Sequence, residues 1–157
     1  MMKMRRFYAF IFMVTILLLS FAYYLQYVQH IAPCSLCILQ RFAYFGIAVV
    51  SAVAFFHVKK TKRYLMWLLI FSAIGLMMSG WQTYLQLFVS TTGSACGPSF
   101  AFMLKNFPLH EAIAALFYGH GECGLITWTF LTLSIAQWSL IFFAGLTGLF
   151  IFYLKKR

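Results

Sequence analysis

Four long apolar runs without a single charged residue constrain this sequence more than any other feature. A helix needs about 20 residues to cross the hydrocarbon of a bilayer. A soluble domain of this length has a larger share of charged residues than the 9% found here, beside 64% hydrophobic residues. The sequence therefore predicts four membrane-spanning helices. The charge-free runs cover residues 7–28, 42–56, 64–89 and 124–154.

The predicted spans are these runs adjusted to the thickness of a bilayer. The second run is long enough only if its helix begins at Cys37 and takes in Arg41, and the fourth exceeds one crossing, so its span is placed late. We expect an all-α membrane protein, a four-transmembrane-helix bundle in one domain over residues 1–157. The spans are expected at 7–28, 37–56, 64–88 and 134–154, with outer loops at 29–36 and 89–133.

The net charge of +10 is concentrated at alternate ends of the spans. By the positive-inside rule, the residues before the first span, the 57–63 loop and the C-terminal residues face the cytoplasm. A basic nucleic-acid-binding surface is the competing interpretation, and we set it aside because the clusters flank spans. Ten of the 12 basic residues form these clusters: Lys3, Arg5, Arg6, Lys59, Lys60, Lys62, Arg63, Lys155, Lys156 and Arg157.

The first span also has features of a signal peptide, because a basic start and an apolar stretch lead to the small-residue sequence Ser20-Phe21-Ala22. We expect the span to be retained, since the apolar run continues well past Ala22 without a helix-breaking residue.

The long outer loop carries its own helical pattern. Asn106 and Pro108 supply a cap and a first-turn proline, and apolar residues then recur at helical spacing. We expect a short helix lying on the membrane surface or packed on the protein's own spans. Its apolar positions are Leu109, Ile113, Leu116 and Phe117.

All four cysteines fall on the outer side in this topology. Cys34 and Cys37 form a Cys-x-x-Cys pair in the first outer segment, whereas Cys96 and Cys123 lie far apart in the second. Such a pair indicates a redox dithiol or half of a zinc site, and zinc usually requires a second closely spaced pair. We expect no metal. Disulfides that only brace the loops are the structural alternative.

Three features favour redox chemistry over bracing. A Cys34–Cys37 bond would close a very short loop and restrict the unfolded chain little. Cys37 falls at the start of the second span, where the helix dipole favours a thiolate. Arg41 lies one helical turn further on the same face, and its permanent charge favours the same anion.

Arg41 in a spanning helix calls for a polar partner, because an arginine at the bilayer centre costs about 2.5–3.5 kcal/mol on insertion scales. A Cys37 thiolate or the carbonyl oxygen of a lipid-soluble acceptor would serve, and extension to the headgroups is the alternative. Because each disulfide passed on leaves two electrons in the protein, an acceptor is needed. A membrane quinone can reach this boundary, and the sequence has no dinucleotide-binding fingerprint or haem-ligand pair.

The block Pro33-Cys34-Ser35-Leu36-Cys37-Ile38-Leu39-Gln40-Arg41, four spans and a later separated cysteine pair resemble the disulfide bond formation protein B (DsbB) family over essentially the whole chain. The resemblance implies a thiol:quinone oxidoreductase of the bacterial inner membrane. Its expected partner is a periplasmic thioredoxin-like (DsbA-like) oxidase, and its expected cofactor is ubiquinone or menaquinone. The expected quinone contacts are Cys37, Arg41, Gln82 and Gln86.

The resemblance also implies an order of events. The partner's dithiol attacks Cys96 of a Cys96–Cys123 disulfide, and the freed Cys123 attacks Cys34. Cys37 leaves as a thiolate beside the quinone, and Arg41 stabilises its charge. Mixed disulfides and thiolate nucleophiles are general features of such exchange.

Three alternatives remain at this point. The vitamin K epoxide reductase-like family also combines four spans, quinone and cysteine pairs, but there the loop cysteines precede the Cys-x-x-Cys pair. A DsbB-like paralogue with a dedicated partner is the second alternative. A non-catalytic membrane scaffold braced by disulfides is the third.

Overall fold

The computed structural model describes residues 2–30, 35–57, 61–89 and 129–156, together with Asn106, Pro108 and His110. Four long helices dominate the described residues, and a single π-helical turn extends the third helix. The long helices are α1 (Met2–Tyr27), α2 (Ser35–Phe56), α3 (Thr61–Tyr84) and α6 (Ile135–Lys155). The π-helical turn is η2 (Leu85–Val89), and the strands β1 (Thr129–Phe130) and β2 (Leu133–Ser134) pair before α6.

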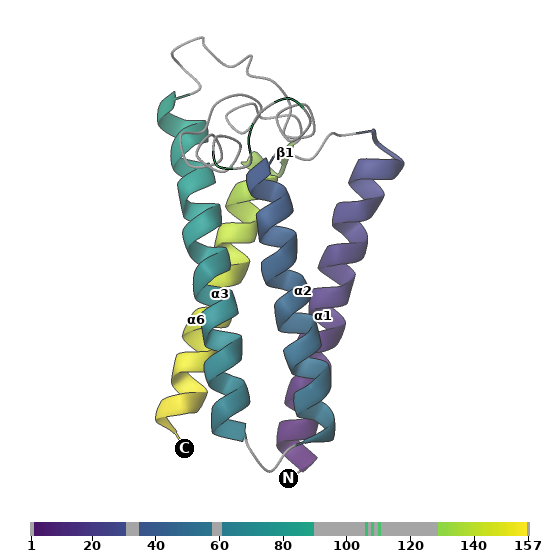
Figure 1. The fold of residues 1–157 in the computed structure, drawn as a ribbon, viewed down its shortest axis with the longest axis vertical. Helices are drawn as coiled ribbons and strands as arrows, with labels where there is room; N and C mark the ends of the chain where they lie inside the picture. The colour runs from purple at the N-terminus through teal and green to yellow at the C-terminus, as the bar shows by residue number, and fades with distance from the viewer. Residues whose placement is uncertain are drawn as a thin grey trace.

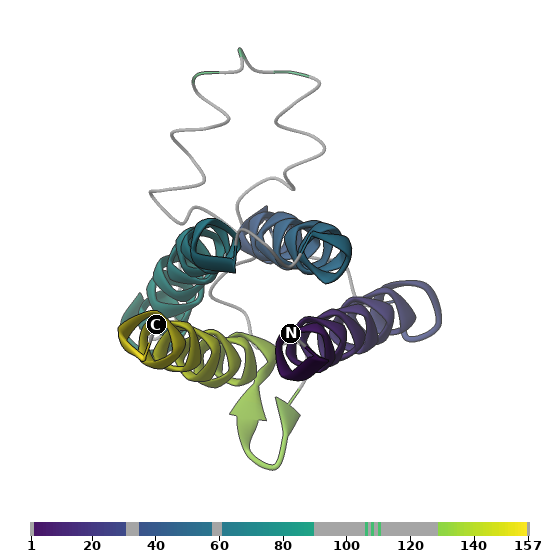
Figure 2. The same cartoon turned by 90° about the horizontal axis from the view of Figure 1, so that it is seen from below.

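The four helices lie side by side in a bundle, in the order α1, α2, α3 and α6 around it (Figures 1 and 2). Both chain termini lie at one end, which we call the terminal end; the opposite end is the Cys37 end (Figure 1). All four helices are long and apolar enough to cross a membrane, with mean hydropathies of 1.6 to 2.0. The prediction of an all-α bundle with four membrane-spanning helices is confirmed.

The first three helices begin earlier than the sequence suggested, at Met2, Ser35 and Thr61, whereas α6 begins one residue later than the predicted start, at Ile135. α1 starts at Met2 instead of residue 7, because basic side chains at a membrane surface do not stop a helix. α2 starts at Ser35, so Cys37 lies in its first turn, as expected. The helical path after α3 widens into η2, which the sequence pattern did not predict.

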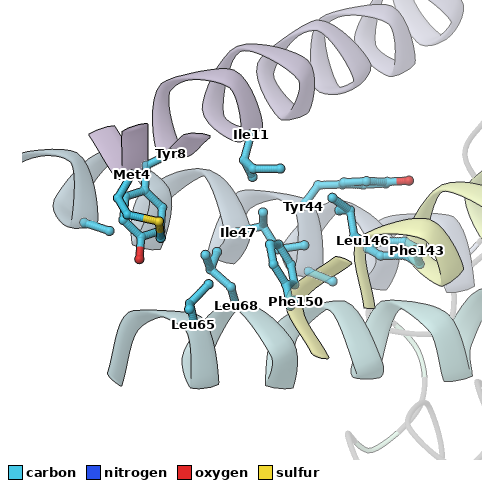
Figure 3. Packing of buried hydrophobic residues seen from close by; sticks show 12 residues of the cluster. Met4, Tyr8, Ile11, Tyr44, Ile47, Leu65, Leu68, Phe143, Leu146 and Phe150 are labelled. Atoms are coloured by element: carbon cyan, nitrogen blue, oxygen red, sulfur yellow. The ribbon is translucent and has the colours of Figure 1, made fainter. Parts of the chain in front are cut away.

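The main apolar core lies between the helices and is drawn in Figure 3. Every helix contributes to it, and Tyr8, Phe143 and Phe150 are fully buried. The Tyr44 and Phe143 rings stack with centroids 4.3 Å apart, which joins α2 to α6. Near the terminal end, the Phe7 ring of α1 lies 4.5 Å from the Tyr153 ring of α6. Aromatic packing therefore closes the bundle between its first and last helices.

One glycine permits the close approach of α3 and α6. A Cβ atom added to Gly75 would lie 2.3 Å from the Phe143 ring, a distance that real Cβ atoms do not tolerate. Beside this contact, Thr147 Oγ1 donates to Ser72 Oγ over 3.1 Å. Small residues that let helices approach and hydroxyl bonds between helices are typical of packing in membranes.

A short hairpin precedes α6, in a region that we expected to be loop. Its turn residues Leu131 and Thr132 both have positive φ, at 53° and 68°, a conformation that favours Asn and Gly. Trp138 Nε1 donates to the Phe130 carbonyl over 3.0 Å, which holds the hairpin against the first turn of α6. The expected surface helix near residues 106–117 lies almost wholly outside the described residues and stays a prediction.

Candidate functional site

Cys37 lies in the first turn of α2 at the Cys37 end of the bundle. It is half-buried and disulfide-bonded. Its neighbours form a small apolar cluster separate from the main core, built on the buried side chains of Leu36 and Leu85. The three other predicted redox residues, Cys34, Cys96 and Cys123, lie outside the described residues.

Two buried glutamines connect α3 to this cysteine. Gln82 Nε2 donates to Cys37 Sγ over 3.2 Å. Gln40 Nε2, from the next turn of α2, donates to Gln82 Oε1 over 2.8 Å. Gln40 is 4% exposed and Gln82 is 3% exposed, so the bond between them is buried, whereas the bond to Cys37 is partly buried. The structure therefore brings the predicted residues Cys37 and Gln82 together.

Gln86 makes a different contact from Gln82, although the two residues are four positions apart, about one helical turn. Ser134 Oγ, at the N-cap of α6, donates to Gln86 Oε1 over 2.7 Å. Ser134 also forms a capping box with Gln137, so its hydroxyl is fixed from both sides. Gln86 therefore joins η2 to the start of α6, while Gln82 is bonded to α2.

Arg41 is held by α1. Its guanidinium donates from Nη1 to Gln26 Oε1 and from Nη2 to the Ala22 carbonyl, the latter over 3.1 Å. The Arg41 Cζ atom also lies 5.0 Å from the centre of the Tyr23 ring. The sequence required a polar partner for this arginine and suggested a Cys37 thiolate or a quinone oxygen. The contacts seen here are to α1 instead, one turn below Cys37 on α2.

Gln40 and Gln26 are the site residues that sequence reasoning did not single out. The available signal was a polar residue inside an otherwise apolar span, which in membranes usually bonds a neighbouring helix. That signal indicates that both side chains form hydrogen bonds within the bundle. It does not say which helix face each would meet, because the rotation of one span against another is not readable from either run.

The arrangement can favour negative charge on one sulfur. An amide N–H points at Cys37 Sγ, and Cys37 occupies a helix N-terminus, where unpaired backbone N–H groups face outward. Arg41 adds a permanent positive charge one turn away. Each of these effects stabilises a thiolate relative to a thiol.

Comparison with known proteins shows that this sequence is not isolated. The family model described as "Disulfide bond formation protein DsbB" matches residues 4–153. Proteins named "Disulfide bond formation protein B" from Marinobacter nauticus and Azoarcus sp. are similar to the chain. The first is 35% identical over 99% of this chain and 95% of its own length, and the second is 38% identical over 89% and 86%. A protein of the same name from Nitrosococcus oceani is 39% identical over 84% and 80%.

Proposed function

This chain belongs to the DsbB family and is a membrane protein of disulfide bond formation, and from that premise we propose that it is a thiol:quinone oxidoreductase. It reoxidises a periplasmic thioredoxin-like (DsbA-like) dithiol oxidase and passes the electrons to a membrane quinone. The observation that carries the proposal is the donation of Gln82 Nε2 to Cys37 Sγ at the rim of a membrane bundle. A disulfide that only braced a loop would have no need of a buried donor aimed at its sulfur.

The relay runs from the partner to Cys37 through two exchanges. A partner thiolate attacks Cys96, so that a mixed disulfide forms and Cys123 leaves as a thiolate. Cys123 then attacks Cys34, and the electron pair of the Cys34–Cys37 bond leaves on Cys37. Each step forms one S–S bond and breaks another, and the electron pair resides at last on Cys37.

The chain's own groups make Cys37 a good leaving group. The leaving thiol departs faster as its pKa falls, and the Gln82 N–H, the start of α2 and Arg41 all favour the anion. Gln82 and Arg41 are held by neighbouring helices before any reaction occurs, so little reorganisation is required when charge appears.

The residues around Cys37 suit a quinone. The group would be held by Cys37, Arg41, Gln82 and Gln86, whose amide and guanidinium N–H groups can donate to carbonyl oxygens. Buried polar side chains in a spanning bundle usually bond a neighbouring helix, and here one of those bonds ends on the sulfur of Cys37. When bound there, ubiquinone or menaquinone supplies a lipid-soluble two-electron acceptor. The cycle would close by further exchanges: the partner's second thiolate displaces Cys96, Cys96 attacks Cys123 and displaces Cys34, and the Cys34–Cys37 bond re-forms as the electron pair passes to the acceptor.

We place the Cys37 end on the periplasmic side of a bacterial inner membrane. The basic clusters at the terminal end support this orientation through the positive-inside rule, and the similar proteins are bacterial. Thiols on that side would meet an oxidising compartment. An impermeant maleimide, applied to intact cells after gentle reduction, should label the cysteines without entry into the cytoplasm.

The direct test is quinone-coupled oxidation of a reduced thioredoxin-like partner by the purified protein in nanodiscs. We expect quinone absorbance to fall with turnover, and Cys37→Ala to abolish it, because no leaving thiolate can form at that position. A partner that lacks its second active-site cysteine should remain trapped on Cys96 of the unaltered chain, because it has no thiol with which to resolve the mixed disulfide. An unchanged rate in the Cys37 variant, or the absence of any adduct, would instead support a braced scaffold.

A further inference from the structure

We propose that Gln40 is a positioning residue for the redox reaction, acting on Cys37 through Gln82. By donating to Gln82 Oε1, it fixes the Gln82 amide so that its N–H group faces the sulfur that becomes a thiolate. The inference rests on the proposed function, because it assigns a role within the exchange step at Cys37.

The chemistry of a disulfide sulfur determines the direction of both bonds. A sulfur in a disulfide carries no hydrogen and can only accept, so Gln82 must present its NH₂ group to Cys37 Sγ over the 3.2 Å contact. Its Oε1 atom then faces Gln40, which must donate over the 2.8 Å contact. If the Gln82 amide turned over, two acceptors would meet at the sulfur and two donors at Gln40.

Because both glutamine side chains are buried, the wrong orientation of the Gln82 amide would be costly. The two glutamine side chains are almost completely enclosed, and Leu36 and Leu85 are buried beside Cys37. Hydrogen bonds in such low-dielectric surroundings are electrostatically stronger than in water, and a turned amide would leave a costly unpaired group. A lone Gln82 could rotate about its last torsion, whereas one held by Gln40 cannot do so without losing a bond.

The bond grows stronger during the reaction. When the Cys123 thiolate attacks Cys34, the Cys34–Cys37 bond breaks and its electron pair moves to Cys37 Sγ, with no proton transferred. A hydrogen bond to an ionised acceptor is roughly twice as strong as one between neutral groups. Gln82 therefore stabilises the product of the exchange more than the starting disulfide, and Gln40 keeps this donor in place.

The test measures the thiol pKa of Cys37 in the full chain in nanodiscs, with Cys34→Ala to keep Cys37 reduced. The pH dependence of iodoacetamide alkylation, followed on the Cys37 peptide by mass spectrometry, gives that pKa. Gln40→Met and Gln82→Met retain the length of the unbranched side chain and remove its amide. We expect each to raise the Cys37 pKa by about one unit, which corresponds to about 1.4 kcal/mol.

The decisive comparison is the double variant. If Gln40 acts through Gln82, adding Gln40→Met to Gln82→Met will raise the pKa no further. Additive shifts, or an unchanged pKa in Gln40→Met, would overturn the proposal. Should Gln40→Met alone fail to fold, Gln40→Asn takes its place, because its shorter side chain keeps the amide but loses the bond to Gln82 Oε1; an unchanged Cys37 pKa in that variant would overturn the proposal.

Thr83→Val is the matched control. Thr83 is buried next to Gln82, but its hydroxyl donates to the Ser79 carbonyl within α3 over 2.8 Å. Its loss should leave the Cys37 pKa unchanged, and a shift equal to that of Gln40→Met would assign the effect to general loosening of α3 and overturn the proposal. The alkylation readout needs neither partner nor quinone, so a failure here is distinguishable from a failure of the proposed relay.

Discussion

At the terminal end of the bundle, α1 meets α6 through the rings of Phe7 and Tyr153, whereas at the Cys37 end the helices are joined by amide, hydroxyl and guanidinium groups. The first kind of contact is close-packed and resists deformation. The second is directional, and its strength changes with the charge on the acceptor. The protein thus separates the packing that fixes its four helices from the polar contacts that respond to chemistry.

The pair of helices α1 and α2 departs from this contrast, because an arginine joins them at each end. Near the terminal end, Arg5 of α1 donates to the Phe55 carbonyl of α2 over 3.3 Å and lies 4.9 Å from the Phe55 ring. Near the Cys37 end, Arg41 of α2 makes the equivalent contacts to α1. The two arginines make similar contacts, and only Arg41 lies one helical turn from Cys37, the proposed redox residue.

The largest effect on stability should come from Phe143→Ala in the main core. Removing this fully buried ring leaves a cavity between α3 and α6, and we expect the free energy of unfolding to fall by about 3 kcal/mol. Unfolding titrated with denaturing detergent measures the loss. Phe10→Ala, which removes a ring that is 65% exposed, is the control and should change stability little. Equal losses in the two variants would contradict a close-packed core between the helices.

A smaller loss is expected from Gly75→Ala. The new Cβ would meet the Phe143 ring at 2.3 Å, and overpacking of this kind costs about 1–3 kcal/mol. Gly148→Ala adds the same atom to α6 where nothing lies within 4 Å. Alanine is the better helix former, so that control should be neutral or slightly stabilising in the same unfolding assay. The reverse order would show that α3 and α6 are not in close contact.

Arg41→Met should affect turnover more than stability. Loss of the charge beside Cys37 should slow quinone-coupled turnover about tenfold, equivalent to about 1.4 kcal/mol, while the Cys96–Cys123 disulfide still forms. Arg5→Met removes the matching clamp at the terminal end and should leave turnover near that of the unaltered protein. If both variants slow turnover equally, the contribution of Arg41 is the joining of α1 to α2 and not its charge near the sulfur.

The smallest effect is expected at the hairpin before α6. Replacing Leu131 and Thr132 by Asn and Gly supplies residues that tolerate positive φ at both turn positions. We expect a gain of about 0.5–1 kcal/mol in the free energy of unfolding, because strain in the turn is relieved. Thermal unfolding of the double variant would show the gain as a raised midpoint. A lowered midpoint would mean that the exposed Leu131 side chain makes a contact that matters.

The sequence predicted the helices well because a span needs about 20 residues with few charges, and the charge-free runs could be adjusted to that length. It placed Cys37 in the first turn of α2 and Arg41 inside the span, and both positions agree with the structure. It could not predict that Gln40 meets Gln82, or that Arg41 turns toward Gln26. Those contacts depend on the rotation of each helix about its axis, and spans that are apolar on every side give little periodicity from which to read it.

The widening of α3 into η2 and the Leu131–Thr132 turn also escaped prediction. Both are local departures from regular geometry that the surrounding contacts impose, and neither has glycine or proline as a marker. The roles of Cys34, Cys96 and Cys123 remain predictions drawn from their spacing and from the family resemblance, since these residues lie outside the described part of the chain.

The amides beside Cys37 also bear on acid tolerance. The amide side chains of Gln40, Gln82 and Gln86 neither gain nor lose protons in the pH range in which bacteria grow. Their hydrogen-bond donors and acceptors therefore stay the same in acidic and alkaline media. A histidine or carboxylate in their place would change its hydrogen-bonding role as the medium changed. The pH on the proposed outer face is set by the external medium. Neutral amide neighbours keep the environment of the Cys37 sulfur constant when that pH changes.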